Sequence, residues 1–481
     1  MGVIRFLSRN TFMIVVLAVS MVTFSCSKDE DDDVKMKKEQ ADYTVMMYGV
    51  GGGDLDLYLK YNLDQVQTYG HSEKVNFTAI VKYSADEQEG EGMDGTRLLT
   101  MTPEGMDNER MAGPEFRMDD PQNLADFIIS SRERFPAKNY VLVLWNHGLE
   151  FSMYDQPVND NYNTAKSSRA LLFDDNTEEY GREASLSIFE LEEALARVGD
   201  KVDLLYWDVC TMNMIEHIYQ LREHVDYILG AEHLTPSYGG NYAALIHSLE
   251  NNPDVLSAMQ KYVAEMKDFW LSMLGDYSPY DLTLVDLQYA EEVVQCVKRC
   301  ADELIAIRDG NESGSQQDLL FHYFLGTMDK NATWFYSPGG YLYFPYNEDE
   351  YPATVVDMFY LFRGMGDALC NGVLSTYVTR LGYLLQDFLP VTECFGTPSW
   401  VTRISLGLYF DEGKFFMEEK EGRPVNSLSK LYKMLDFDKV VGWSRFIEKN
   451  SYRKIKEKLD EEGNILYDED YFPLLEEVTE K

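Results

Sequence analysis

Two polar motifs in this sequence contain the residue types of a nucleophilic active site. His147 and Gly148 follow an apolar segment over residues 140–145, and Cys210 follows a second apolar segment over 204–207. In open α/β sheets, ligands bind beyond the carboxyl ends of the strands. If the two segments are neighbouring parallel strands, His147 and Cys210 face each other there. Such a pair can use a thiolate as nucleophile and the imidazole as proton acceptor and then donor.

The surroundings of Cys210 favour this chemistry. The residues after it have helix-like spacing, so we expect Cys210 to lie where a buried strand ends and a helix begins. Free N–H groups and a partial positive charge at a helix N-terminus favour a thiolate. The N–H groups of Gly148 and Cys210 can then form an oxyanion hole. Each residue alone also fits a structural role, since a cysteine after an apolar strand is often just buried.

The elements that must position these residues alternate between strands and helices. This order predicts an α/β fold with a mixed, mostly parallel sheet and helices on its faces. Asp120 is a plausible cap of one helix. Apolar runs predict strands over 43–50, 75–83, 140–145, 204–207 and 227–230, and helical spacing predicts helices over 55–69, 122–134 and 185–198.

Two further regions complete the expected organisation. Residues 150–183 are polar and predict a long exposed loop that contains a short strand over 170–173. Beyond Tyr242 the chain becomes richer in helix. That part predicts helices over 243–274 and 287–309, and strands over 281–285 and 401–410.

The charge balance excludes some function classes. The chain has 43 Lys and Arg against 82 Asp and Glu, a formal net charge of −39. Such a chain repels nucleic acid, so we exclude nucleic-acid binding. It attracts cations, including calcium and basic peptides, although an acidic surface also simply keeps a protein soluble. The sequence contains no HExxH motif and no CxxC pair of zinc-ribbon type, so zinc has little support.

The N-terminus has the pattern of an export signal. Residues 1–25 contain two arginines followed by an apolar run that is too short to span a bilayer comfortably, which indicates a signal peptide. The ending before Cys26 resembles a bacterial lipobox, so we expect lipidation of Cys26. Residues 26–40 form an acidic tether, which suggests the outer membrane of a Gram-negative bacterium and exposure on the cell surface. An ordinary signal peptide with an incidental cysteine is the alternative.

The other cysteines leave the redox state open. Five of the six cysteines lie beyond Cys26, and an odd number leaves at least one thiol unpaired in an exported protein. Cys296 and Cys300 share one helical face. They fit a core position, a reducible pair, or pairing with Cys370 and Cys394. If those four pair among themselves, Cys210 remains free.

Longer segments resemble the clostripain family of cysteine peptidases. The similarity is strongest in YVLVLWNHG and in WDVCTMNMIEHIYQLREHVDYILGAEHLTP, and it extends to YTVMMYGVGGGDLD, LLFDDNTEEYGREASLSIFELEEAL, ISLGLYF and YKMLDFDKVVGWSRFI. The resemblance implies a caspase-like α/β/α sandwich. It implies a catalytic domain over 41–280, and a C-terminal region over 281–481 that completes the fold and carries an α-rich extension.

The resemblance also implies roles for individual residues. His147 and Cys210 correspond to the catalytic dyad of the family, which cleaves after basic residues. Asp208 matches one acidic group of the family's S1 pocket. Tyr238 stands where a second acid is usual, so the preference for Arg or Lys is weakened, and Glu232 compensates for the missing charge only in part.

Family members are often zymogens that cut themselves between the His and the Cys. Lys166 and Arg169 are therefore candidate autoprocessing sites, although any exposed loop contains some basic residues. Some relatives use calcium. Asp174 and Asp175 could contribute to a calcium site, although their spacing does not match an EF-hand. We expect that catalysis itself requires no cofactor.

Three hypotheses follow. The first is a surface-anchored endopeptidase that cleaves protein or peptide substrates after Arg or Lys by way of an acyl-enzyme. The second is a lipoprotein that binds peptide or glycan on a peptidase-like scaffold with an idle dyad. The third is a peptidase that prefers a non-basic residue at P1.

Overall fold

The computed structural model describes residues 40–52, 55–84, 93–113, 115–153, 168–179, 182–274, 280–333, 355–395, 403–408, 419–420, 423–424, 428–449, 453, 455–469 and 471–478. Residues Gln40–Lys481 form one compact unit. The predicted signal peptide, Cys26, the tether up to residue 39 and Lys166 lie outside the described residues. Within the described ranges, no helix combines the length and the apolar character that crossing a membrane requires.

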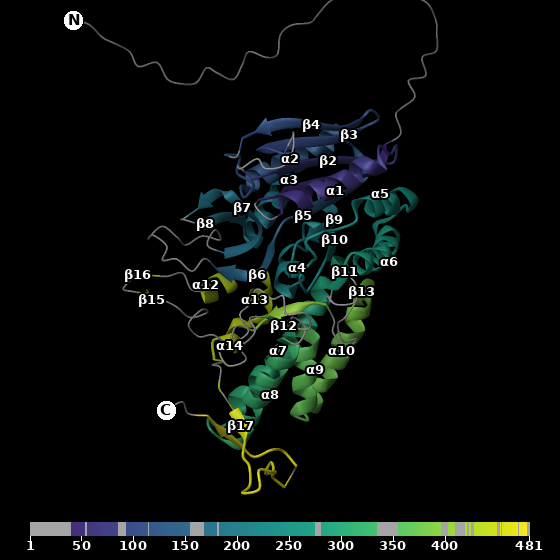
Figure 1. The fold of residues 1–481 in the computed structure, drawn as a ribbon. Coiled ribbons are helices and arrows are strands. Elements are labelled where there is room, and N and C mark those ends of the chain that lie inside the picture. The colour runs from purple at the N-terminus through teal and green to yellow at the C-terminus, as the bar shows by residue number, and fades with distance from the viewer. Residues whose placement is uncertain are drawn as a thin grey trace, which may run out of the picture. The chain divides into compact units, whose positions relative to one another are not determined.

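The centre of the fold is a nine-stranded sheet with the order β13-β11-β10-β9-β5-β1-β2-β3-β4 (Figure 1). The strands from β10 to β2 in this order run parallel, and those outside them pair antiparallel. The predicted mixed, mostly parallel sheet is therefore confirmed. The strands are β1 (Ala41–Val50), β2 (Val75–Lys82), β3 (Thr96–Thr102), β4 (Gly105–Ala112), β5 (Ala137–Trp145), β9 (Val202–Asp208), β10 (Val225–Gly230), β11 (Tyr280–Asp286) and β13 (Val391–Phe395).

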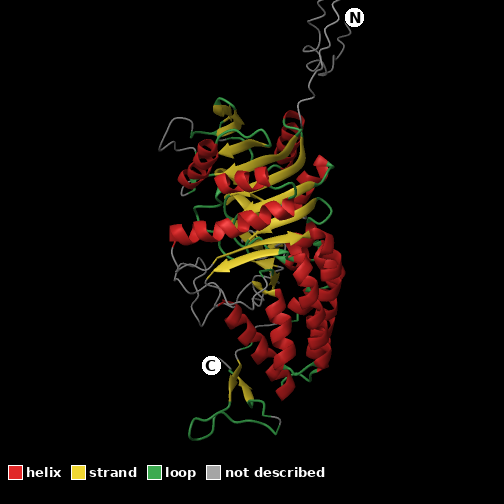
Figure 2. Ribbon diagram, turned by 90° about the vertical axis from the view of Figure 1, so that its right-hand side faces the viewer, coloured by secondary structure: helices red, strands yellow, loops and turns green. Residues whose placement is uncertain are grey.

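The central strands bury both faces, because successive side chains of a strand point to opposite sides. Tyr206 of β9 belongs to the core on one face, and Leu205 and Trp207 belong to the core on the other. Figure 2 shows helices packed against the strands. The first face is covered by α1 (Asp56–Tyr69), α5 (Tyr242–Asn251) and α6 (Val255–Leu274), and the second by α2 (Pro121–Arg134), α3 (Ile188–Val198), α4 (Ile215–Gln220) and α7 (Ala290–Gly310).

The C-terminal region is rich in helix, as predicted, and it extends the core of the second face. Its helices are η3 (Leu287–Tyr289), α8 (Gln316–Thr333), α9 (Met358–Ala368), α10 (Gly372–Phe388), α12 (Leu428–Tyr432), α13 (Asp436–Val441) and α14 (Ser444–Ile447). Its small sheets pair β12 (Val355–Asp357) with β14 (Ser405–Gly407), β15 (Glu419–Lys420) with β16 (Arg423–Pro424), and β17 (Ile455–Glu457) with β18 (Leu475–Glu477).

Two helix starts near the site show how local sequence sets the boundaries. Asp120 caps α2 by accepting from Gln122 N, as predicted, and the helix begins at Pro121, one residue before the predicted start. α3 begins at Ile188 rather than at Ser185. Ser187 and Glu190 form a capping box there, which satisfies the free N–H groups of the first turn.

The predicted exposed loop over 150–183 is wrong for the part of that range that the structure describes. That part forms a three-stranded antiparallel sheet of β6 (Gly148–Met153), β7 (Ser168–Glu179) and β8 (Arg182–Leu186). Leu171 to Asp174 of β7 are buried. The predicted short strand over 170–173 lies within β7, and its Leu171 and Leu172 belong to the core.

Candidate active site

Parallel pairing of β5 with β9 brings the two polar motifs together. Trp145 pairs with Asp208, and each strand ends at that residue. His147 lies two residues beyond the end of β5, and Cys210 lies two residues beyond the end of β9. The condition on which the predicted dyad depends, that the two strands are parallel neighbours, is therefore met.

Gly148 lies close against the backbone of Cys210. A Cβ atom on Gly148 would lie 2.3 Å from the carbonyl oxygen of Cys210 and 3.1 Å from its backbone nitrogen. Real Cβ atoms do not approach that closely, so this position needs glycine. His147 is exposed, whereas Gly148 is buried, so the imidazole lies at the surface above a tightly packed backbone.

The expectation that Cys210 lies at a helix N-terminus is wrong. α4 begins at Ile215, and Thr211 adopts a left-handed φ of 55° directly after the cysteine. Thr211 N then donates to His233 O at 3.0 Å, and Asn213 N donates to Ala231 O at 3.1 Å. The segment after Cys210 is held by these backbone bonds, which a helical periodicity in the sequence does not reveal.

The loop after β10 holds the thiol of Cys210. Cys210 Sγ donates to the carbonyl oxygen of Thr235 at 3.7 Å, and Thr235 Oγ1 donates to Val209 O at 3.0 Å. Cys210 is only partly exposed. One loop therefore contacts both the nucleophile candidate and the residue before it.

Asn146, which sequence reasoning left unassigned, fixes the backbone beside His147. Its Nδ2 donates to Val50 O at 2.7 Å and to Gly51 O at 3.3 Å, while its Oδ1 accepts from Phe173 N at 2.6 Å. The end of β1 and the strand β7 are thus joined through one buried amide. A polar residue between a buried strand and a candidate histidine was the available signal.

Lys82 is a second residue that the sequence reasoning did not single out. It is fully buried, and its Nζ lies 2.5 Å from Asp174 Oδ2 and 2.8 Å from Phe116 O. Asp174, one half of the candidate calcium site, therefore belongs to a buried ion pair that ties β7 to β2. No group of three or more His, Cys, Asp or Glu that could hold a metal ion occurs within the described ranges.

Asp208 is buried at the end of β9 and is only 3% exposed. Its Oδ2 accepts from Gly240 N at 2.8 Å and from Tyr242 Oη at 2.7 Å. Its Oδ1 is buried and has no hydrogen-bond partner. Burial raises the pKa of this carboxyl to about 6, although the two hydrogen bonds oppose the shift. A carboxylate with one free oxygen is suited to a cationic group.

Tyr238 lies in the loop that covers Asp208. Its ring packs edge-on against Tyr58 and Tyr61 of α1, with centroid separations of 5.3 and 6.0 Å. Asn62 Nδ2 donates to the carbonyl oxygens of Tyr238 and Gly240, both at 2.9 Å, and so holds the loop. An aromatic side chain therefore occupies the position where the family resemblance leads one to expect an acid.

Glu232 is a weak source of the missing charge. It is buried, and its pKa is raised well above its usual range by burial and by the nearby Asp357 and Asp281, whereas Arg403 lowers it. Its backbone N–H donates to Asp281 Oδ2 at 2.9 Å. Burial therefore works against the ionised carboxylate that a basic P1 side chain requires.

The C-terminal region supports the segment after Cys210. Ser405 N donates to Asn213 O at 2.9 Å. Glu216 Oε1 accepts from Gly407 N at 2.8 Å and from Tyr432 Oη at 2.6 Å. Burial raises the pKa of Glu216 to about 7. Residues about 200 positions apart thus hold α4 and the loop before it.

The remaining predicted residues are Arg169 and the cysteines. Arg169 does not lie in an open loop. It is a residue of β7 and pairs with Ser152 of β6. The five cysteines beyond Cys26 form no disulfide with one another, and Cys296 and Cys300 are buried whereas Cys370 is exposed. Cys296 and Cys300 are thus core residues of α7 in this structure.

Comparison with known proteins agrees with this architecture. The clostripain family model matches residues 90–357. Clostripain of Hathewaya histolytica is 26% identical over 380 residues, and the alignment covers 68% of this chain. It spans 66% of clostripain, just under two thirds of that protein's length.

Two solved structures share the fold. A secreted C11 cysteine protease of Bacteroides thetaiotaomicron in complex with an irreversible peptide inhibitor has a TM-score of 0.56 at 14% identity, over 84% of this chain and 100% of that one. An inactive zymogen C11 protease from Parabacteroides distasonis has a TM-score of 0.54 at 15% identity, over 84% and 99%. The family model covers more than half of the sequence, and its assignment agrees with the motifs around His147 and Cys210. The chain therefore belongs to the clostripain family of cysteine peptidases.

Proposed function

We propose that this chain is a cysteine endopeptidase in which Cys210 is the nucleophile and His147 is the general base and acid. Cys210 Sγ attacks the peptide carbonyl and forms a thioester, and His147 delivers a proton to the leaving amine. Water then hydrolyses the thioester and regenerates the thiol. The observation that supports this most directly is the parallel register of β5 and β9, in which Trp145 is opposite Asp208.

The oxyanion that forms during each step needs nearby donors. We assign this role to the N–H groups of Gly148 and Cys210. The support is the close approach of the two backbones, in which the Cβ position of Gly148 lies 3.1 Å from Cys210 N. Two N–H groups held by a rigid sheet edge stabilise charge without reorganising.

The proposed preference is cleavage after Arg or Lys. Asp208 supports it, because a buried carboxylate with one oxygen lacking a partner gains most from a cationic ligand. Tyr238 supports a second candidate, a peptidase with a non-basic P1 preference. Its ring packs against Tyr58 and Tyr61, which gives this wall of the site an aromatic surface.

Profiling cleavage of a mixed peptide library separates these candidates. The wild-type chain is expected to cleave after Lys or Arg, and Cys210→Ala and His147→Ala are expected to lose at least about 1000-fold in kcat. Cleavage after apolar residues would establish the non-basic alternative. Binding of peptides or glycans without any cleavage or labelling of Cys210 by a peptidyl electrophile would establish the idle scaffold. Wild-type rates in Cys210→Ala would overturn the nucleophile assignment.

The export, processing and calcium proposals rest on the sequence motifs. We propose a lipid anchor on Cys26 at the outer membrane, tested by incorporation of a labelled fatty acid in the wild type and in Cys26→Ala. Processing at Lys166 or Arg169 is tested by chain masses of the wild type and Cys210→Ala. Activity before and after chelation tests whether calcium contributes.

A further inference from the structure

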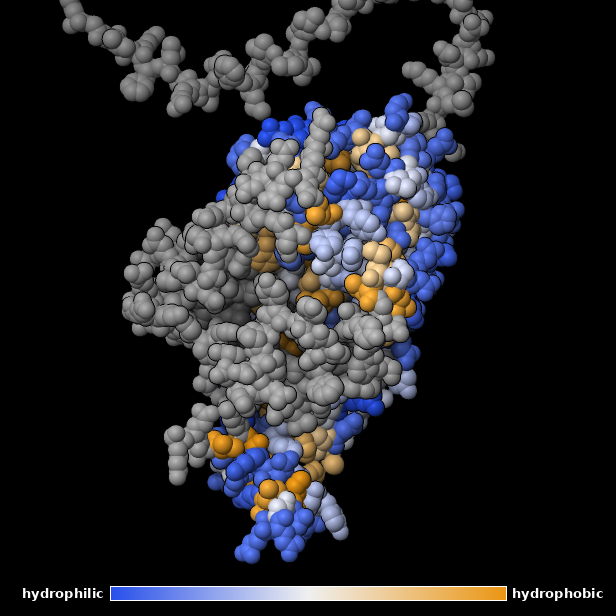
Figure 3. Space-filling model, in the orientation of Figure 1, coloured by the Kyte–Doolittle hydropathy of each residue, from blue (hydrophilic) through white to orange (hydrophobic). Residues whose placement is uncertain are grey.

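A small projection at the C-terminal end of the described chain exposes apolar side chains beside acids. We call residues 459–474 the C-terminal tip. Leu459, Tyr467 and Tyr471 of the tip are 56%, 55% and 85% exposed. Ile465 and Leu466 are exposed as well. Figure 3 shows hydrophobic and hydrophilic residues next to one another in the lowest part of the molecule.

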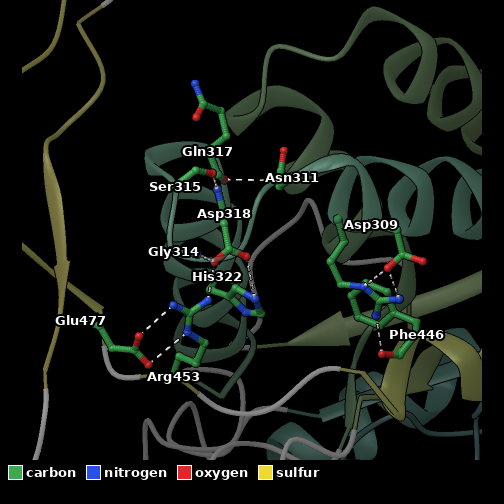
Figure 4. Close-up of polar contacts among 11 residues, drawn as sticks. Asp309, Asn311, Gly314, Ser315, Gln317, Asp318, His322, Phe446, Arg453 and Glu477 are labelled. Carbon is green, nitrogen blue, oxygen red and sulfur yellow. Dashed lines mark hydrogen bonds and ion pairs between the residues drawn. The ribbon is translucent and has the colours of Figure 1, made fainter.

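Polar contacts join the base of the tip to α8. The Arg453 guanidinium donates to Asp318 Oδ2 at 2.7 Å and to the two carboxylate oxygens of Glu477 at 3.1 and 2.8 Å (Figure 4). Gln316 donates to Leu475 O and accepts from Leu475 N, at 3.1 and 3.0 Å. Partial burial opposes ionisation of Asp318, but its bonds, chiefly with Arg453, outweigh that effect and lower its pKa, and Arg453 also lowers the pKa of Glu477.

An apolar cluster completes the mounting. Leu319 and Leu320 of α8 pack with Leu475, and Phe472 packs against this group. Phe472 therefore faces inward while its neighbour Tyr471 faces solvent. The apolar side chains of the tip are thus exposed even though the base of the tip packs against α8.

The tip also has defined turns of its own. Asp460 Oδ1 accepts from Glu462 N and Asn464 N at 2.9 and 2.8 Å. Asp468 Oδ1 accepts from Phe472 N at 2.9 Å. Both turns end in short antiparallel bridges, Leu459 with Ile465 and Tyr467 with Pro473. The backbone that carries the apolar side chains therefore has a defined course.

The charge of the tip limits what can cover it. Residues 459–474 include six acidic residues and no Lys, Arg or His. Apolar area drives association, and the acids favour a cationic partner and repel an anionic one. A second copy of this chain, with a net charge of −39, would place acids against acids. An anionic membrane is disfavoured for the same reason.

We propose that the C-terminal tip is an exosite that captures basic, apolar-containing segments of polypeptide substrates. The proposal rests on the proposed function, since substrates cleaved after Arg or Lys carry the matching charge. Aromatic side chains such as Tyr467 and Tyr471 contribute large contact area at low conformational cost. Capture at the tip raises the local concentration of a tethered substrate at the active site.

The binding test uses the full chain with Cys210→Ala, so that no cleavage occurs. The probe is a fluorescent synthetic peptide of Lys and Leu, compared with a peptide in which Glu replaces Lys. Tyr467→Ser with Tyr471→Ser is expected to weaken binding of the Lys peptide about tenfold. Tyr383→Ser is the matched control, because Tyr383 is 62% exposed on α10. Equal binding by all three proteins would overturn the exosite.

Glu461→Gln with Glu462→Gln separates charge from apolar contact. Both residues are exposed in the tip. The double variant is expected to bind the Lys peptide more weakly and with a shallower dependence on salt, since screening acts on exposed charges. A dimer in sedimentation that Tyr467→Ser with Tyr471→Ser dissociates would overturn the proposal in favour of self-association.

The kinetic test distinguishes this proposal from the proposed function. Tyr467→Ser with Tyr471→Ser is expected to lower kcat/KM for a basic protein substrate about tenfold and to leave that for a short peptide unchanged. An equal fall for both substrates would overturn the exosite. If the wild type cleaves neither substrate, the proposed function fails, and the binding test with Cys210→Ala still decides whether the tip captures basic segments.

Discussion

Gly148 lies so close to Cys210 that a Cβ at position 148 would come within 2.3 Å of the Cys210 carbonyl oxygen. Gly148→Ala must therefore displace the backbone on which the proposed nucleophile and the proposed oxyanion donors lie. We expect kcat to fall about 100-fold with a stability loss of about 1–3 kcal/mol. Gly372→Ala is the control, because its Cβ meets nothing within 4 Å. A wild-type kcat in Gly148→Ala would contradict the proposed oxyanion hole.

Asn146 is expected to act as a positioning residue for His147. Asn146→Asp replaces the donor that bonds Val50 O with a carboxylate oxygen, and the repulsion shifts the backbone before His147. We expect kcat to fall about tenfold or more, with KM nearly unchanged, because small displacements of a catalytic group are costly. Asn139→Asp, at the other end of β5, makes the same change far from the site and is expected to leave kcat unaltered.

The charge state of Asp208 predicts how selectivity depends on pH. Burial raises its pKa to about 6, so the carboxylate forms only above that pH. The ratio of kcat/KM for a Lys peptide to that for a neutral peptide isolates this group, because titration of the dyad cancels. We expect the wild-type ratio to rise as pH increases through about 6. In Asp208→Asn we expect the ratio to be lower by about tenfold or more and to be independent of pH. A flat wild-type ratio would exclude Asp208 from P1 recognition.

Tyr238 is expected to limit the preference for basic residues. Tyr238→Asp adds a second carboxylate near Asp208 and should raise the selectivity for Arg and Lys over neutral residues about tenfold. Tyr238→Phe retains the ring contacts with Tyr58 and Tyr61 and is expected to behave like the wild type. Library profiling of both variants measures the change. Unchanged profiles in Tyr238→Asp would show that this loop does not contact P1.

The buried carboxyl of Glu216 is expected to make the protein less stable as pH rises. Its folded pKa is about 7 against an ordinary value of 4.5, because it is buried. Between those values the unfolded chain loses the proton while the folded chain retains it, so the free energy of unfolding falls as pH rises, by up to about 3 kcal/mol. Glu216→Gln should lack this component in denaturant unfolding at pH 5 and pH 8. Glu312→Gln, at an exposed position, is the control, and parallel curves for wild type and Glu216→Gln would contradict the prediction.

The family of the protein and the layout of its sheet follow from local patterns. Strands such as β1 and β9 consist mainly of apolar residues, as expected for a strand buried on both faces. Helices α1 and α3 repeat apolar residues at helical spacing. The polar motifs that follow β5 and β9 make His147 and Cys210 the candidate dyad on local pattern alone.

The tertiary structure decided what depends on contacts between distant residues. The turn at Thr211, the bonds of Asn146 and the ion pair of Lys82 with Asp174 join segments that are far apart in the chain. Local periodicity does not show which distant backbone group a side chain will contact. The setting of Asp208 likewise comes from Gly240 and Tyr242, which fold back over it. Sequence thus determined the residue types at the strand ends, and burial with strand register determined how those residues are held.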